Sequence, residues 1–416
     1  MGFNAFNLFG LAGFIFVAWV FSANKKAINW KTVGAGLLLQ FIIARVVITD
    51  VVQDKVFSPI NDFITALLAF AQKDGAAFVL KSFATNAVEP ANLNFAFWVL
   101  PTVIFFSSIM TLLYHFGVMQ PIIKVIAKVM QKIMGTSGSE SMSCSANIFV
   151  GQTEAPLLIK PFVGTMTRSE LHAVMVGGFG TVAGGVLALY AGILQDIPGI
   201  AGHLVTASCM AAPGALVISK ILYPETEESN TMGEVKMEVE TLDSNFIEAA
   251  SRGATEGMQL LINIVAMLIA FVAMVAMFDS AMLFLTGLIG YPTSFTQLLG
   301  YLFLPFAWLM GAPNHELVLV GQLLGKKVVL TELLAYTELS SLVAKGEISA
   351  YSQLICSYAL CGFANFASIG IQIGGIGGIA PERRSDLAKL GLSAMFGGML
   401  VTCCTATIAG VFFVVK

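Results

Sequence analysis

The chain has 416 residues, of which 57% are hydrophobic and 11% are charged, and its formal net charge is −3. A soluble domain carries about 25% charged residues, so this composition, with a mean hydropathy of +0.83, excludes an ordinary soluble protein and predicts an integral membrane protein. The sequence has no basic tract typical of nucleic-acid binding, and its six cysteines lie in apolar segments without metal-ligand spacing.

The first two apolar runs, residues 4–22 and 32–49, are each long enough to cross a hydrocarbon core of about 30 Å. The N-terminus lacks a basic n-region and an evident cleavage site, so we expect the first run to be retained as a transmembrane helix. Lys25, Lys26 and Lys31 follow this run. The positive-inside rule therefore places the N-terminus outside the cytoplasm.

The next part of the chain mixes charged and apolar positions. Within it, the run 60–70 predicts an amphipathic helix on the outer surface. A third span is predicted over 94–117, running from outside to inside.

Residues 119–134 carry lysines at a four-residue spacing, at Lys124, Lys128 and Lys132, with Ile and Val on the opposite face. This pattern predicts an interfacial helix on the cytoplasmic side.

The stretch 141–166 begins and ends with cytoplasmic signals but has a polar interruption in its middle. The interrupting residues are Asn147, Gln152, Thr153, Glu154 and Pro156. Irregular backbone at membrane depth persists only where protein covers it or where it lines a cavity. We therefore expect a re-entrant hairpin rather than a simple span.

The rest of the chain is predicted as spans separated by an acidic cytoplasmic linker over 223–245 and a broken region over about 298–345, centred on Glu332. The predicted spans are 170–193, 202–222, 258–288, 351–378 and 385–413. This layout places both termini outside the cytoplasm and most Lys and Arg residues inside.

The order of hairpin, span and span occurs twice, at 141–222 and at about 298–413, and the two copies enter from opposite sides. Each copy has a glycine-rich first span, with glycines from Gly177 to Gly185 and from Gly370 to Gly378. This is the inverted-repeat plan of secondary transporters, whose sites form at broken helices near the midplane.

Two carboxylates, Glu154 and Glu332, fall at the centres of the broken regions. An ionisable residue at the bilayer centre costs about 2.5–3.5 kcal/mol on insertion scales. Each carboxylate either pins its hairpin through backbone N–H groups or faces a polar solute across an aqueous cavity, and we favour the second interpretation.

Five segments, in order along the chain, carry a recognisable pattern: Gly151–Leu157 (GQTEAPL), Ala211–Gly214 (AAPG), Gly325–Tyr336 (GKKVVLTELLAY), Ala359–Asn365 (ALCGFAN) and Ala406–Gly410 (ATIAG). With them the sequence resembles the concentrative nucleoside transporter family along nearly its whole length. One departure is Thr331, where the family usually has Asn.

The resemblance implies an all-α membrane protein with eight transmembrane helices, two re-entrant hairpins in an inverted repeat, interfacial helices, and assembly as a homotrimer. It further implies an elevator mechanism and four regions. These are a scaffold over 1–117, a first transport repeat over 118–222, an acidic linker with a scaffold helix over 223–297, and a second transport repeat over 298–416.

The resemblance also implies roles for individual residues. Gln152, Thr153 and Glu154 are expected to contact the nucleobase. Glu332, Asn365 and Ser368 are expected to bind the ribose hydroxyls. Apolar contact with base and sugar is expected from Phe363, Val186 and Met258. An amide and a hydroxyl match the adjacent donors and acceptors of a base edge. A carboxylate accepts charge-assisted hydrogen bonds from a vicinal diol.

For the coupling ion, the family's sodium site corresponds to Asn147, Val150, Thr181 and Val182. Their amide, hydroxyl and freed carbonyl oxygens suit a small hard cation. Hydrogen bonding between the hairpin and the neighbouring helix is the alternative explanation for Asn147 and Thr181.

We therefore predict a sodium-coupled importer of uridine-like nucleosides in a bacterial inner membrane, with membrane lipid around it and no cofactor besides the coupling ion. A proton-coupled transporter of nucleosides or nucleobases, using Glu154 or Glu332, remains the alternative. A channel is disfavoured because no repeated ring of charges or carbonyls is evident. An enzyme is disfavoured because no nucleophile has a neighbouring base.

Overall fold

The computed structural model describes residues 5–47, 100–232 and 243–413, and every regular element in these ranges is a helix. This agrees with the prediction of an all-α membrane protein, in which helices satisfy their own backbone hydrogen bonds. The predicted amphipathic helix over 60–70 lies outside the described residues.

The first half of the chain begins with four helices close to their predicted positions. They are α1 (Ala5–Val20), α2 (Trp30–Val47), α7 (Leu100–His115) and α8 (Met119–Met134). Helix α8 turns by 77° from α7 and exposes its three lysines, as the lysine spacing predicts. The face that it buries carries Met119, Ile123, Ala127, Met130 and Met134. The valines expected on that face, Val125 and Val129, are exposed because each follows a lysine directly on the helix surface.

The first predicted hairpin is confirmed as a broken structure. It consists of α9 (Gly138–Ala146), the 3-10 helix η5 (Ala155–Ile159) and α10 (Lys160–Val163), with irregular backbone between α9 and η5. The polar interruption seen in the sequence coincides with this irregular segment.

The predicted span over 170–193 corresponds to a segment that is long and apolar enough to cross a membrane, but it is broken within. It consists of α11 (Arg168–Gly180) and α12 (Gly184–Ile193), separated by a break at Thr181–Ala183 in which Thr181 is extended. A contact with the first hairpin stabilises the break, because the Gly184 N–H donates to the Phe149 carbonyl of the hairpin at 3.0 Å. The following helix, α13 (Ile200–Leu222), is continuous.

The second half contains a long helix and a second hairpin. Helix α14 (Phe246–Gly287) starts well before the predicted 258, because the Asn245 side chain caps it by accepting from two backbone N–H groups. The helices of the predicted broken region are α15 (Phe295–Leu309), α16 (Leu317–Val329) and α17 (Glu332–Lys345).

The predicted span over 351–378 is likewise two helices, α18 (Ala350–Ala359) and α19 (Phe366–Ile379), and the 3-10 helix η6 (Pro381–Arg383) follows. The side chain of Asn365 caps α19 and sets its first residue. Helix α20 (Arg384–Val411) completes the fold.

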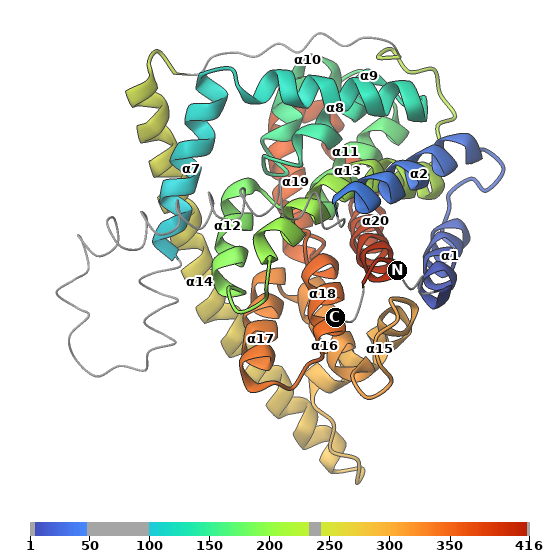
Figure 1. The fold of residues 1–416 in the computed structure, drawn as a ribbon, viewed down its shortest axis with the longest axis vertical. Coiled ribbons are helices and arrows are strands. Elements are labelled where there is room, and N and C mark those ends of the chain that lie inside the picture. Colours follow the sequence, from blue (N-terminus) through green and yellow to red (C-terminus); the bar gives the residue numbers. More distant parts are fainter. Residues whose placement is uncertain (1–4, 48–99, 233–242, 414–416) are drawn as a thin grey trace.

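A hairpin, a broken helix and a continuous helix thus follow one another twice, as α9–α13 and as α16–α20. The first hairpin lies at one end of the molecule and the second toward the other (Figure 1). Among the described residues, three segments are long and apolar enough to cross a membrane: Arg168–Ile193, Ile200–Leu222 and Pro381–Val411. A fourth is added if α7 and α8 count as one bent span.

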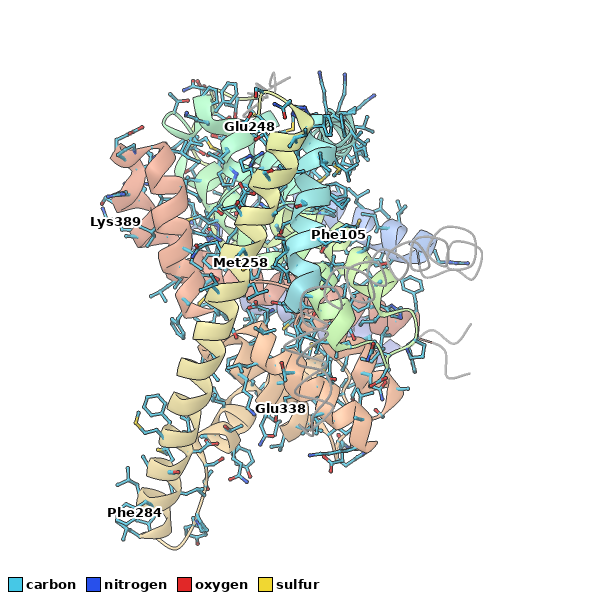
Figure 2. All side chains as sticks on the ribbon, turned by 90° about the vertical axis from the view of Figure 1, so that its left-hand side faces the viewer. Phe105, Glu248, Met258, Phe284, Glu338 and Lys389 are labelled. Atoms are coloured by element: carbon cyan, nitrogen blue, oxygen red, sulfur yellow. The ribbon has the colours of Figure 1, made fainter. Side chains whose placement is uncertain are left out.

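Helix α14 runs along one face of the molecule beside α7 (Figure 2). Two glycines permit the close approach. A Cβ on Gly253 would lie 2.6 Å from Thr111 Oγ1, and one on Gly257 would lie 2.6 Å from Ile104 Cα. This pair of helices forms one wall of the cavity described next.

Candidate functional site

A cavity of about 620 Å³ lies between the α7–α14 wall and the irregular centre of the fold. Its other walls come from the tip of the first hairpin and from the first turns of α12, α17 and α19. Three helix N-termini therefore face one space, and their partial positive charge favours electron-rich groups there. The predicted solute-binding residues that line it are Gln152, Thr153, Glu154, Val186, Glu332, Phe363, Asn365 and Ser368.

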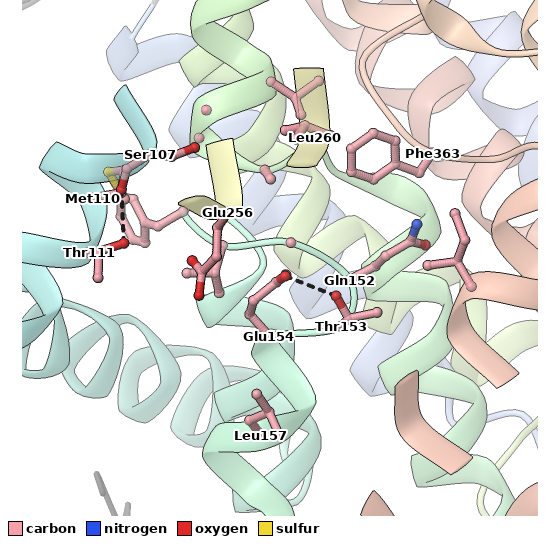
Figure 3. Close-up of a pocket in the computed structure, with 18 of the residues that line it drawn as sticks. Ser107, Met110, Thr111, Gln152, Thr153, Glu154, Leu157, Glu256, Leu260 and Phe363 are labelled. Atoms are coloured by element: carbon pink, nitrogen blue, oxygen red, sulfur yellow. Dashed lines mark hydrogen bonds between the residues drawn. The ribbon is translucent and has the colours of Figure 1, made fainter. Parts of the chain in front are cut away.

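Met258 is the predicted solute-binding residue that the structure places outside this cavity. Its side chain is 45% exposed on α14. Glu256 and Leu260 of the same helix line the cavity instead, and they lie near the hairpin residues and Phe363 (Figure 3). The apolar contact expected from Met258 is thus available from Leu260.

The buried carboxylate of the site is Glu332, the first residue of α17, with 5% exposure. Its Oε1 accepts a 2.6 Å hydrogen bond from the Tyr190 hydroxyl, and its Oε2 accepts a 3.0 Å bond from Asn365 Nδ2. The helix N-terminus and two donors hold the carboxylate in one orientation.

Tyr190 is a site residue that sequence reasoning missed. It lines the cavity from α12, where it is a polar hydroxyl in an otherwise apolar and glycine-rich helix. That isolated hydroxyl was the available signal, because a Tyr buried in an apolar span needs a hydrogen-bond partner.

Asn365 connects the second break to the carboxylate. Its Oδ1 accepts from the Ser368 N–H at 2.9 Å and caps α19, while its Nδ2 donates to Glu332. Thr331 has the matching role for α17, since its side chain accepts from the Leu334 N–H at 3.4 Å. Backbone caps therefore fix where the polar side chains stand.

The tip of the first hairpin is held by amide hydrogen bonds. Gln152 Nε2 donates to Ser368 Oγ at 3.3 Å, and Gln152 Oε1 accepts from Gln372 Nε2 at 3.0 Å. Gln372, which is fully buried, also donates to the Met175 carbonyl at 3.1 Å. Gln372 was not predicted, and it is what fixes the orientation of the Gln152 amide.

Glycines make room for this tip. A Cβ on Gly178 would lie 2.7 Å from Gln372 Nε2 and 2.8 Å from Gln152 Cβ. A Cβ on Gly375 would lie 2.5 Å from Thr153 Cγ2. Glycines in the first span of each repeat, in α11 and in α19, thus allow the hairpin backbone to approach both broken helices.

Glu154 differs from Glu332 in its surroundings. It is exposed within the open part of the cavity and accepts a 3.0 Å hydrogen bond from Thr153 Oγ1. From there the cavity continues toward Lys160 and the Asp243–Arg252 ion pair. Hydrogen bonds from the Arg252 guanidinium, both 2.8 Å, lower the pKa of the Asp243 carboxyl below its ordinary value.

The predicted ion ligands lie together beside the first break. Asn147 directly follows the last residue of α9 and is fully buried, and neither its Oδ1 nor its Nδ2 has a hydrogen-bond partner among the described residues. Thr181 and Val182 belong to the break itself, and Thr181 Oγ1 donates to the Gly177 carbonyl at 2.8 Å. An orphaned amide oxygen beside unwound backbone fits a small hard cation.

Within the described residues, no group of three or more His, Cys, Asp or Glu side chains is placed to hold a metal ion. The atoms near Asn147 that could coordinate an ion are uncharged oxygens. They suit a weakly bound monovalent cation better than a transition metal.

Three family models match the chain. They are described as the Na+ dependent nucleoside transporter N-terminus, matching residues 9–83, nucleoside recognition ("Gate"), matching 96–196, and the Na+ dependent nucleoside transporter C-terminus, matching 203–410.

Similar proteins cover almost the full chain. An uncharacterized transporter of Bacillus subtilis, YutK, is 41% identical over 97% of this chain and 98% of its own length. Sodium/nucleoside cotransporter 1 of Mus musculus is 39% identical over 97% of this chain and 63% of its own length. The solved structure of CNTnw in an inward-facing substrate-bound state has a TM-score of 0.89 and 40% identity, covering 98% of this chain and 97% of that one.

Proposed function

This chain belongs to the sodium-dependent nucleoside transporter family, and from that premise we propose that it is a sodium-coupled secondary active importer of nucleosides. The observation that carries the proposal is the cavity in which the buried carboxylate of Glu332 and the oriented amide of Gln152 face the same space. Family membership makes the chain a multi-pass membrane transporter; its coupling ion, substrate and transport cycle are what we propose.

The polar groups of the cavity are divided in a way that suits a nucleoside. Glu332 and Asn365 offer a carboxylate and an amide at one side, which suits the two hydroxyls of a ribose. Gln152 and Thr153 offer donors and acceptors on the hairpin side, which suits the edge of a base. Phe363 and Leu260 supply apolar surface between them.

Specificity follows from the burial of Glu332. A solute without vicinal hydroxyls would leave this carboxylate less completely hydrogen-bonded in a desolvated site, and such a loss weakens binding more than a missing apolar contact does. We therefore expect ribonucleosides such as uridine to be preferred over dideoxynucleosides.

Sodium is proposed to bind beside the first break, through Asn147, Thr181 and the carbonyls of Val150 and Val182. The orphaned Asn147 amide supports this placement. Downhill entry of one cation supplies about 2.3 kcal/mol per 100 mV, which suffices to concentrate a neutral solute.

The transport cycle is proposed to be an elevator. In this scheme 1–117 and 223–297 form the scaffold of a homotrimer, and 118–222 and 298–416 carry the solute across the inner membrane. Both termini lie outside the cytoplasm. The position of the cavity between the α7–α14 wall and the two repeats supports this division.

The test is uptake of labelled uridine by proteoliposomes at fixed pH. An inward sodium gradient should accelerate uptake, and replacement of sodium by choline should abolish the acceleration. Equal uptake in choline would overturn sodium coupling, and stimulation by an inward proton gradient alone would establish proton coupling instead. Absence of uptake of any nucleoside in a purine and pyrimidine panel would overturn the substrate class.

A further inference from the structure

Lys327 is a fully buried lysine that the proposed solute site does not use. It lies in the last turn of α16, in the second hairpin, and its side chain is 0% exposed. Its Nζ donates to the Ala359 carbonyl at 2.8 Å and to Thr402 Oγ1 at 2.7 Å. Both acceptors are uncharged oxygens, so the ammonium is solvated by the protein in the way that a bound cation would be.

The acceptor Ala359 has a particular place in the fold. It is the last residue of α18, at the start of the second break. The final carbonyls of a helix have no partner within the helix, and together they carry a partial negative charge. The Lys327 ammonium therefore sits at the negative end of a half-helix.

The second acceptor joins a third helix to this contact. The Thr402 hydroxyl donates to the Met399 carbonyl at 3.0 Å within α20, which leaves its oxygen free to accept from Lys327. The break itself packs on the same residue, since a Cβ on Gly362 would lie 2.7 Å from Thr402 Cγ2. One ammonium thus connects the second hairpin, the broken helix and the continuous helix of the second repeat.

The first repeat has an equivalent helix end. Helix α11 ends at Gly180, and its break at Thr181 holds the residues proposed above to bind sodium. The two breaks are in direct contact, because the Phe363 N–H donates to the Thr181 carbonyl at 3.2 Å. Carbonyls at the C-terminal ends of broken helices are the typical cation ligands in transporters of this architecture.

We propose that Lys327 is a tethered cation: its ammonium occupies, in the second repeat, the helix-end position at which the proposed sodium ion binds in the first repeat. The proposal rests on the sodium-coupled function above. Lys327 then acts as a positioning residue: its charge holds the end of α18 and the break that follows, and the break in turn presents Asn365 to Glu332.

The experiment removes the charge in two ways. Lys327→Met keeps most of the volume without the charge, and Lys327→Ala removes the side-chain atoms beyond Cβ that n-propylammonium contains. Uridine affinity is measured by titration of the purified full-length protein in sodium. We expect both variants to bind uridine at least tenfold more weakly than the unsubstituted protein.

Rescue then separates charge from packing. n-Propylammonium, added during solubilisation, should restore most of the affinity of Lys327→Ala, whereas n-propanol should not, and neither compound should improve Lys327→Met. Lys326→Met is the matched control. Lys326 is the neighbouring residue, forms an ion pair with Glu338 and is partly exposed, so this variant should bind uridine normally without the additive.

Unchanged affinity in Lys327→Met would overturn the proposal, and so would equal rescue by n-propanol, since filling of space alone would then explain the effect. Thermal unfolding gives a reading that does not depend on the solute. n-Propylammonium should raise the melting temperature of Lys327→Ala only, and the absence of a rise would also count against the tethered cation. Failure of the unsubstituted protein to bind any nucleoside would instead overturn the proposed substrate class.

Discussion

The Tyr190 hydroxyl and the Glu332 carboxylate are joined by a 2.6 Å hydrogen bond across 142 positions of the sequence. The bond connects the second half of the first broken helix to the tip of the second hairpin. The Tyr190 ring also packs against Tyr336, with ring centroids 4.5 Å apart. Groups from both repeats, Tyr190 and Asn365, therefore orient the Glu332 carboxylate.

Tyr190→Phe tests this orientation. The variant removes a hydrogen bond to a charged acceptor, which typically contributes about 1.5–3 kcal/mol, so uridine affinity should fall by about tenfold or more. Tyr336→Phe is the control, because its hydroxyl donates to the Ser357 carbonyl and not to Glu332. Titration of uridine into both proteins makes the comparison, and equal affinities would remove Tyr190 from the site.

Glu332→Gln should reduce uridine uptake by on the order of 100-fold while the protein still elutes as a folded species. The amide replaces one acceptor by a donor, so it no longer matches the donors Tyr190 and Asn365 or a diol. Initial uptake rates should also become similar for uridine and 2′,3′-dideoxyuridine. Retained preference for uridine in the variant would show that the diol is recognised elsewhere.

Gly375→Ala and Gly374→Ala form a matched pair on α19. A Cβ at Gly375 would press on Thr153 Cγ2 at 2.5 Å, whereas a Cβ at Gly374 would meet no atom within 4 Å. Gly375→Ala should displace the hairpin tip and raise the KM for uridine severalfold. Gly374→Ala should keep the KM and stabilise the helix by up to about 1 kcal/mol; a similar KM in both variants would contradict close packing of the tip.

Asn147→Ala should raise the sodium concentration needed for half-maximal uridine uptake by at least about tenfold, since the orphaned amide oxygen is a proposed ligand. Ser145→Ala is the control: Ser145 is a buried polar residue on α9 whose hydroxyl already donates to the Ser141 carbonyl at 2.7 Å, so this variant should keep the sodium dependence. The measurement is uptake against sodium at constant ionic strength. An unchanged sodium dependence in Asn147→Ala would place the ion elsewhere.

The Asp243–Arg252 pair predicts a pH dependence of stability. Because the folded-state pKa of Asp243 is lowered, the stabilisation is present above the ordinary Asp pKa and is lost as the pH falls through the folded value. Asp243→Asn should therefore lower the unfolding temperature in detergent by a constant small amount from pH 5 to 8. The corresponding loss in the free energy of unfolding should be on the order of 1 kcal/mol at most, because Arg252 is partly exposed. A difference that vanished between pH 5 and 8 would contradict the lowered pKa.

The sequence allowed the hairpins and the position of α8 to be predicted because their signals are local. A carboxylate such as Glu154 in an apolar run is costly, and the lysine period of α8 defines one face. The break at Thr181 was missed because a glycine-rich apolar run is also typical of close helix packing. Asn365 and Ser368 were predicted as site residues, but the break at 360–365 beside them was included in the span predicted over 351–378. What opens these breaks is capping and contact from distant segments, such as the Phe149 carbonyl on Gly184.

The site residues missed by sequence reasoning are those whose role depends on a distant partner. Gln372 becomes significant only when it meets Gln152, 220 positions away. Which residues of α14 line the cavity could not be predicted either, because the packing of Gly253 and Gly257 against α7 sets the rotation of this helix about its axis. That packing directs Leu260 rather than Met258 into the cavity.

The contact between the two breaks has a thermodynamic consequence. The peptide N–H of Phe363, whose ring lines the solute cavity, is bonded to the carbonyl of Thr181, a proposed ion ligand. Any movement of the Thr181 backbone on ion binding would be transmitted through this hydrogen bond to Phe363, which lines the solute cavity. If sodium tightens nucleoside binding, as the proposed function requires, linkage makes the effect reciprocal: nucleoside must tighten sodium binding by the same factor. In the proposed cycle, a single backbone hydrogen bond between the two breaks would therefore carry part of the free energy that couples solute uptake to the ion.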